Sequence, residues 1–280
     1  MSATVTTPAD LDRFREVQQL AYRCATEVAA SLRPGITERQ AARRMRWWLQ
    51  ANGVEDWFHL PYAWFGDRTA FRDFRVSLQF FPTNRVLLEG MPFILDCAPV
   101  VDGFTADIGY AASCGSNPVL DSLLDDLEPI RELIVRLVRA RRPLREVYAA
   151  VDALIASQGN ENRHRIYPGA VIGHQVFRVT SRLPRLRLAR FGVRSLAHLE
   201  RELIAGRLAG RSPLWNGRRA SDHPPTPGLW AVEPHLGQGA VGAKFEELLV
   251  VTEDDAYWLD DDLPHVRRWK RAATETATAA

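Results

Sequence analysis

The feature that most constrains the fold of this chain is a set of residues able to bind metal, spread over distant segments. The set comprises four acids and one histidine: Asp96, Asp107, His174, Glu233 and Glu246. Four carboxylates and one imidazole form a ligand set that can hold two divalent cations side by side around an activated water. We therefore expect a fold that brings these segments together, and a metal-dependent hydrolase.

The segment around the first two acids predicts a β-hairpin. Residues 93–95 form a short apolar run, residues 101–103 supply a turn with Asp-Gly, and the chain returns from Phe104. Antiparallel neighbours lie about 5 Å apart, so Asp96 and Asp107 would face each other across the ladder. Two bare carboxylates at that distance repel each other, and a cation between them removes the conflict.

The order of predicted elements favours an α+β fold with an antiparallel sheet rather than strand–helix–strand alternation. Capping signals and apolar periodicity predict helices over residues 8–32, 37–53, 119–141 and 144–157. Strands are predicted within residues 76–81, 91–110, 167–180, 229–233, 246–252 and 257–259. Residues 59–81 are otherwise aromatic-rich and irregular. Helices precede strands twice, so residues 8–112 and 119–260 share one plan.

Composition points to a soluble globular protein. The 280 residues are 46% hydrophobic and 25% charged, and a net charge of +2 gives no strong field toward nucleic acid or membrane. Residues 1–10 lack the apolar stretch of a signal peptide, and no apolar run could span a bilayer. Three scattered cysteines in apolar contexts indicate a reducing compartment, hence the cytoplasm. We predict one domain over 8–262 and a disordered tail over 270–280.

The motifs around the five ligands resemble those of the superfamily of methionine aminopeptidases, Xaa-Pro aminopeptidases and creatinases, the pita-bread metallohydrolases. The resemblance extends over about residues 10 to 260. It rests on the spacing from Asp96 to Asp107 with Asp-Gly-Phe between them, Gly173-His174, Val232-Glu233-Pro234, Phe245-Glu246 with the following apolar run, and Pro34-Gly35-Ile36-Thr37-Glu38. Because several motifs occur in the family's order, the resemblance is specific.

This resemblance implies a pita-bread fold, with helices flanking an antiparallel sheet in pseudo-two-fold halves, and a dinuclear centre. Asp96 and Asp107 would hold one ion, His174 and Glu233 the second, and Asp107 and Glu246 would bridge the two. Glu233 would also shuttle a proton. The oxygen-rich ligand set suits Mn, Co or Fe, with Zn as an alternative. The implied activity is that of an aminopeptidase or a dipeptidase resembling Xaa-Pro dipeptidase.

The sequence departs from the family on the substrate side. Gln79, or a neighbour, stands where the family has one substrate-handling histidine, and Ser181 stands at the second position. Arg178 would share the face of His174 if the strand continued, and is a candidate to bind a substrate carboxylate. His235 is a candidate to replace a missing histidine. We expect a small peptide or small-molecule substrate in an altered pocket. The alternatives are a creatinase-like C–N hydrolase and a non-catalytic protein that binds a peptide or partner.

An arginine-rich insertion at about residues 182–225 is a second departure. Residues 182–219 hold ten arginines but only two acids, and leucines recur at helical spacing between 196 and 208. We consider a lid over the site, a homodimer contact, a clamp for an acidic substrate or nucleic acid, and a plain amphipathic surface helix. Nucleic acid is disfavoured because aromatics do not interleave with the arginines.

The glycine-rich turn between Glu233 and Glu246 predicts an open edge of the site. Histidines outside the motifs, His59 among them, are expected to be structural or exposed.

Overall fold

The computed structural model describes residues 7–181 and 183–279, and the side chains of these residues up to position 275. Residues 1–6, where no signal peptide is expected, residue 182 of the predicted insertion and the last residue of the predicted tail lie outside this description. Within the described part, no helix is long and apolar enough to cross a membrane.

Two capped helices open the fold, as predicted. Helix α1 spans Pro8–Ser31 and α2 spans Glu38–Ala51. Thr7 and Asp10 form a capping box at the first helix, where each side chain bonds the other's backbone N–H. Thr37 and Gln40 do the same at the second. These caps satisfy amide groups that would otherwise lack partners, which fixes where each helix begins.

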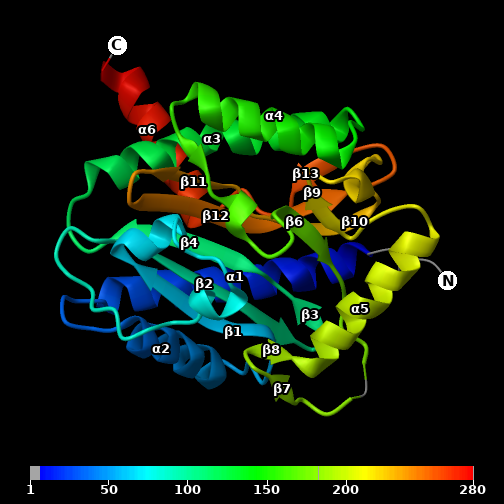
Figure 1. The fold of residues 1–280 in the computed structure, drawn as a ribbon, viewed down its shortest axis with the longest axis horizontal. Helices are drawn as coiled ribbons and strands as arrows, with labels where there is room; N and C mark the ends of the chain where they lie inside the picture. The colour runs from blue at the N-terminus through cyan, green and yellow to red at the C-terminus, as the bar shows by residue number, and fades with distance from the viewer. Residues whose placement is uncertain (1–6, 182, 280) are drawn as a thin grey trace.

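An antiparallel sheet forms the centre of the molecule (Figure 1). Its main path runs in the order β7-β8-β1-β2-β4-β12-β10-β6-β9. The principal strands are β1 Asp56–Phe65, β2 Pro92–Val101, β4 Ile108–Ser113, β6 Val171–Val176, β10 Gly228–Val232 and β12 Val241–Val251. The shorter strands are β3 Phe104–Thr105, β5 Glu161–Asn162, β7 Arg187–Leu188, β8 Phe191–Gly192, β9 Leu214–Asn216, β11 His235–Gln238 and β13 Ala256–Trp258.

Two helix pairs pack on this sheet, one for each half of the chain. Helix α1 packs against β2 and β4, and α2 packs against β1. Helices α3 (Pro118–Arg139) and α4 (Leu144–Ser157) lie together along the other side in Figure 1, with α3 against β12 and α4 against β9. One apolar core runs through both halves. The predicted α+β class with an antiparallel sheet is confirmed.

Strand β1 is the main element that the sequence did not predict. It occupies part of the segment expected to be irregular, whereas the strand predicted over 76–81 is wrong: residues Ser77–Phe80 form a short 3-10 turn. All but one residue of β1 are buried, so the alternation that marks a half-exposed strand is absent. Pro61 and two shifts of register against β2 further obscure its pattern.

Two glycine-containing turns shape the centre of the sheet. Asp102 and Gly103 both have positive φ (51° and 85°), as the tight turn between β2 and β3 requires, and the predicted hairpin is confirmed. The turn between β11 and β12 is exposed at residues 238–240, but the strand beside it is covered. The short 3-10 segment Gly66–Ala70 packs on Gly242 of β12, where a Cβ would lie 2.2 Å from the carbonyl oxygen of Thr69. Glycine there allows the covering segment to approach.

The insertion and the tail are both ordered where they are described. The leucine pattern predicts a helix that the structure places at α5, Val193–Leu208, and the preceding β8 pairs with β1. Helix α6 spans Pro264–Ala279, so the predicted disordered tail is wrong up to that residue. Val266 and Trp269 bury their side chains in the core and anchor the first turns of α6, from which the alanine-rich part continues.

Candidate metal centre

The fold brings the five predicted ligands to the middle of the sheet. Asp96 lies on β2, and Asp107 lies between β3 and β4, where the ladder is interrupted. His174 lies on β6, opposite Ala231 of β10. Glu246 lies on β12, and Glu233 directly follows β10. Gly109 of β4 pairs with Asp96 on one side and with Glu246 on the other, so it stands at the centre of the cluster.

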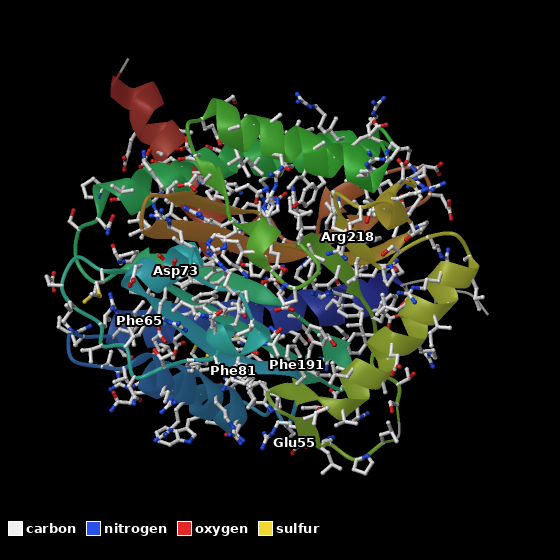
Figure 2. The ribbon with its side chains drawn as sticks, in the orientation of Figure 1. Glu55, Phe65, Asp73, Phe81, Phe191 and Arg218 are labelled. Carbon is white, nitrogen blue, oxygen red and sulfur yellow. The ribbon has the colours of Figure 1, made fainter. Side chains whose placement is uncertain are left out.

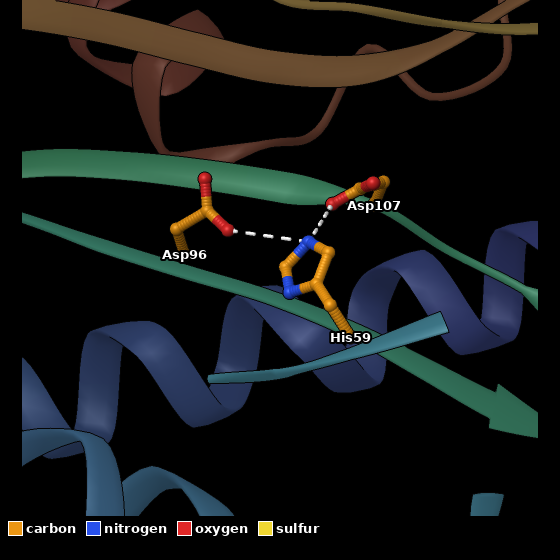
Figure 3. A group of neighbouring side chains, drawn as sticks. All are labelled: His59, Asp96 and Asp107. Atoms are coloured by element: carbon orange, nitrogen blue, oxygen red, sulfur yellow. Dashed lines mark hydrogen bonds and ion pairs between the residues drawn. The ribbon is translucent and has the colours of Figure 1, made fainter. Parts of the chain in front are cut away.

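A sixth group, His59 of β1, joins this cluster although the sequence analysis expected a structural role for it. Its Nε2 lies 3.1 Å from Asp107 Oδ1 and 3.5 Å from Asp96 Oδ1 (Figure 3). The His59 side chain is 9% exposed. Because β1 was not predicted, its pairing with β2 was not available to place His59 beside the acids. A buried histidine beside two carboxylates affects their pKa values, so His59 belongs to the site.

Lys244 is a second residue that was not predicted for the site, and its ammonium lies between three of the acids. Its Nζ donates to Asp96 Oδ2 at 2.8 Å, Glu233 Oε2 at 2.9 Å and Glu246 Oε2 at 2.9 Å. The lysine side chain is 1% exposed. A Cβ on Gly109 would lie 2.1 Å from Lys244 Cε, so the lysine passes through space that only glycine leaves open.

Contacts between opposite charges outweigh the cost of burial for Lys244 and Asp107, but not for Glu246. Burial alone would lower the pKa of Lys244, but Asp96, Glu233 and Glu246 hold it well above its ordinary value. Burial likewise opposes the charge of Asp107, yet His59 and His174 hold the pKa of that carboxyl well below its usual range. Burial, then the charges of Asp107 and Glu233, raise the pKa of Glu246 well above the ordinary value.

Both histidines of the cluster present Nε2 to Asp107. Nδ1 of His59 lies 3.1 Å from the carbonyl oxygen of Leu60, and Nδ1 of His174 lies 3.2 Å from that of Gln175. A carbonyl only accepts, so each Nδ1 carries a proton. His174 Nε2 then faces Asp107 Oδ2 at 3.3 Å. If the ring were neutral, Nε2 would direct its lone pair at an anionic oxygen, and the two atoms would repel each other. A second proton on the ring, or a cation between the two atoms, removes this repulsion. Metal-bound histidines are commonly oriented by such a bond from the other ring nitrogen.

The described bonds of the His235 side chain go to Tyr167 and Thr69 and not to the acids of the cluster. It is fully buried, with Nε2 donating to the carbonyl of Thr69 at 2.8 Å and Nδ1 accepting from the Tyr167 hydroxyl at 3.2 Å. Burial, and then the charge of Lys244, hold the pKa of His235 well below its ordinary value. The ring of Tyr167 in turn lies 5.2 Å from Lys244 Nζ. His235 therefore helps to position the lysine, and its predicted contact with substrate gains no support from this geometry.

The other predicted substrate residues lie away from the acids. Gln79 is exposed, and its side chain accepts from the backbone of Arg75 and Val76 in its own loop. The expectation that Arg178 continues the ligand strand is wrong, because β6 ends at Val176. Arg178 and Ser181 instead line a surface pocket beside the β2–β3 turn. Their contact with substrate stays a prediction.

The arginine-rich insertion packs directly on the histidine side of the cluster. Phe191 of β8, labelled in Figure 2, contacts the ring of His59 at 5.9 Å and that of Phe58 at 5.9 Å. Phe58 also contacts His174, with ring centroids 5.4 Å apart. Leu199 of α5 lines a small pocket with His174. The insertion therefore covers this side of the site, as the lid hypothesis expects. Its role in a homodimer stays a prediction.

Two groups of potential metal ligands share Asp107. His59, Asp96 and Asp107 form one group, and Asp107, His174 and Glu246 form the other, with the ligand atoms of each group within 4.8 Å of one another. The second group, one imidazole and two carboxylates, fits a divalent ion. Lys244 lies among Asp96, Glu233 and Glu246, so its charge would stand beside any ion bound there. The expected pair of ions stays a prediction.

Comparisons with known proteins agree with this fold. The model of metallopeptidase family M24 matches residues 12–253. Over 158 residues the chain is 25% identical to methionine aminopeptidase A of Synechocystis sp., a match of 56% of this chain and 62% of that protein. The X-Pro aminopeptidase of Thermotoga maritima superposes with a TM-score of 0.69 at 16% identity, over 93% of this chain and 63% of its own. Methionine aminopeptidase of Rickettsia prowazekii superposes with a TM-score of 0.62 at 14% identity, over 92% and 99%.

The fold and the site together define a pita-bread protein with a candidate metal centre. The chain belongs to metallopeptidase family M24. The predicted family resemblance and the predicted pita-bread fold are thereby confirmed. The chain spans 62% of the Synechocystis protein and 63% of the Thermotoga chain.

Proposed function

We propose that the chain is a metal-dependent hydrolase that cleaves a C–N bond, as an aminopeptidase or as a dipeptidase of the Xaa-Pro type with an altered pocket. The observation that carries this proposal is the buried group of Asp107, His174 and Glu246, whose ligand atoms lie within 4.8 Å of one another. Membership of a metallopeptidase family supports it. So do the structural neighbours, which are named as aminopeptidases and prolidases.

Asp107, His174 and Glu246 would hold the divalent ion, for which Mn, Co or Fe is proposed and Zn is the alternative. When bound, such an ion polarises a carbonyl and lowers the pKa of a bound water. The chain's own groups then have distinct tasks. The carbonyl of Gln175 orients His174, and the two imidazoles fix Asp107 between them.

Glu233 is the group proposed to take a proton from the attacking water and return it to the leaving nitrogen. Its amide donates to the carbonyl of Ile172 at 2.7 Å, which ties it to β6, and Lys244 fixes its Oε2. Burial raises the pKa of Glu233, although Lys244 opposes the shift. A carboxyl whose pKa is moved toward neutrality suits both halves of a proton transfer.

A non-peptide C–N hydrolase is the second candidate, favoured by the narrowness of the space beside His174. Phe58, Phe177, His198 and Leu199 line this pocket, and the insertion covers it. The cavity is only about 30 Å³, so an extended peptide does not fit beside His174 as the residues lie. We place the protein in the cytoplasm because its three cysteines are free.

The test is an activity screen of the purified, chelator-treated chain. Xaa-Pro dipeptides, peptides with N-terminal Met and amidino compounds would be incubated with added Mn or Co, and products followed by mass spectrometry. We expect hydrolysis in one substrate class, loss with chelator, and loss in His174→Gln. Hydrolysis that survives both treatments would contradict metal dependence. Metal binding without hydrolysis of any class would favour the non-catalytic binding protein.

A further inference from the structure

Asp96 has a side-chain nitrogen of the chain itself beside each of its carboxylate oxygens. Oδ2 accepts from Lys244 Nζ at 2.8 Å, and Oδ1 lies 3.5 Å from His59 Nε2. The side chain of Asp96 is only 6% exposed. The ammonium of Lys244 occupies Oδ2 of Asp96, so an ion on this side would be left with Oδ1, His59 and Asp107, next to a buried positive charge. That neighbouring charge opposes the binding of a second cation.

The position of Lys244 is built into the fold. On β12, Lys244 and Glu246 are two residues apart, so both side chains leave the same face of the sheet. Gly109 provides the passage for the lysine chain, and the ring of Tyr167 lies beside its ammonium. The sequence contains one other lysine, Lys270, on the surface helix α6. Position 244 holds a lysine, although nearly all other basic residues of the chain are arginines. The passage at Gly109 requires a compact cation on a narrow aliphatic side chain, which lysine provides and arginine does not.

The second group of ligands remains complete beside this arrangement. Asp107 and His174 make no contact with Lys244 among the described hydrogen bonds, and His174 Nε2 faces Asp107 Oδ2 at 3.3 Å. Two neighbouring ligand atoms on an octahedral ion with bonds of about 2.1 Å are separated by roughly 3 Å, which is close to this distance. Glu246 completes the group. Lys244 bonds its Oε2 at 2.9 Å, and a carboxylate has a second oxygen to offer an ion.

We propose that Lys244, assisted by His59, permanently replaces the divalent ion that Asp96 would hold, so that the chain binds one ion, on Asp107, His174 and Glu246. This inference rests on the proposed function as a metal enzyme, but concerns how many ions the centre takes and which acids are ligands. Asp96 becomes the counter-ion of Lys244 instead of a metal ligand. The charge on the Asp96 side is then set by the sequence and does not depend on metal supply.

The first experiment counts ions in the wild-type chain. Chelator-treated protein would be titrated with Mn(II) by calorimetry, and the loaded protein analysed for metal content and by electron paramagnetic resonance. We expect one ion per chain and an uncoupled Mn(II) signal. Two ions with a coupled signal would overturn this inference and leave the proposed function standing. No bound ion at all would overturn both.

Four variants then test which residues bind the ion. Asp96→Asn should leave the stoichiometry at one and the Mn(II) affinity within about threefold, whereas His174→Gln should abolish binding. Loss of the ion in Asp96→Asn would overturn the inference. Lys244→Met keeps the length of the side chain and removes its charge, and should raise the count from one to two. Lys270→Met is its matched control and should stay at one.

If Lys244→Met does not fold, the wild-type count and the Asp96→Asn titration still decide the question. If Lys244→Met folds and still binds a single ion, then Lys244 does not occupy the place of a second one, and the inference fails. The readout in every case is the number of ions bound, so inactivity toward the chosen substrates does not affect the result.

Discussion

Replacing Gly109 with alanine tests whether the passage for Lys244 holds the acidic cluster together. The added Cβ would lie 2.1 Å from Lys244 Cε and 3.1 Å from both Cδ and Nζ. Strand β4 cannot retreat, since it is paired with β2 on one side and with β12 on the other. The lysine must withdraw, which leaves Asp96, Glu233 and Glu246 without their common cation.

The expected effect is large for a change of one methyl group. Removing one partner of a buried ion pair costs about 3–5 kcal/mol. Alanine is otherwise better than glycine within an element by about 0.5–1 kcal/mol. The net loss in the free energy of unfolding is then about 2–4 kcal/mol, measurable by urea denaturation with circular dichroism in the presence of chelator.

A double-mutant cycle separates this explanation from ordinary overpacking. Lys244→Ala removes the clashing side chain, so Gly109→Ala added to it should cost little. The two changes should therefore be non-additive by about 2 kcal/mol or more. If the cost of Gly109→Ala is the same in both backgrounds, the lysine is not what the alanine displaces, and the reasoning about the passage is refuted.

Three further predictions concern other parts of the structure. Asp107→Asn should weaken Mn(II) binding about 100-fold or more by calorimetry, since Asp107 belongs to both ligand groups, and unchanged affinity would exclude it as a ligand. Arg131→Met should lower the free energy of unfolding in urea by about 1.5–3 kcal/mol because it removes two charged hydrogen bonds, at 2.6 and 3.0 Å, from the buried Glu247, which keeps its contact with His265, and a loss below about 0.5 kcal/mol would contradict this. Burial lowers the pKa of His164, so the unfolded chain binds the proton more readily and stability should fall as pH drops below about 6.5. His164→Gln should flatten that slope, by at most about 1.4 kcal/mol per pH unit in denaturation midpoints converted to free energy, and an unchanged slope would exclude this histidine as the cause.

Much of the fold could be predicted because its signals are local. The capping boxes at Thr7 and Thr37 mark helix starts with side chains three residues apart, and Asp102-Gly103 marks a turn by its own conformational needs. The predicted ligands could be located because each lies in a short motif. Strand β1 could not be predicted from the sequence. A strand buried on both faces shows no alternation of apolar and polar residues, and the position of β1 depends on pairing with β2, which lies further along the chain.

His59 was missed for the same reason, because its place beside the acids depends on β1. Gln79 and Ser181 were assigned by extending motifs into irregular segments, and their contact with substrate stays a prediction. Lys244 was missed because the predicted strand began at Glu246, whereas β12 begins at Val241 and places Lys244 on the same face as Glu246.

The strand β7 at one end of the sheet gives the arginines of the insertion a further consequence. It is two residues long, and Leu186 and Leu188 are 61% and 68% exposed there. An uncovered edge with apolar side chains invites another chain to pair with it and aggregate. Arg185 and Arg187 alternate with these leucines, and Arg185 pairs with Glu55. Like charges on two approaching edges repel each other, so we expect Arg187 to oppose the pairing of two copies at this edge.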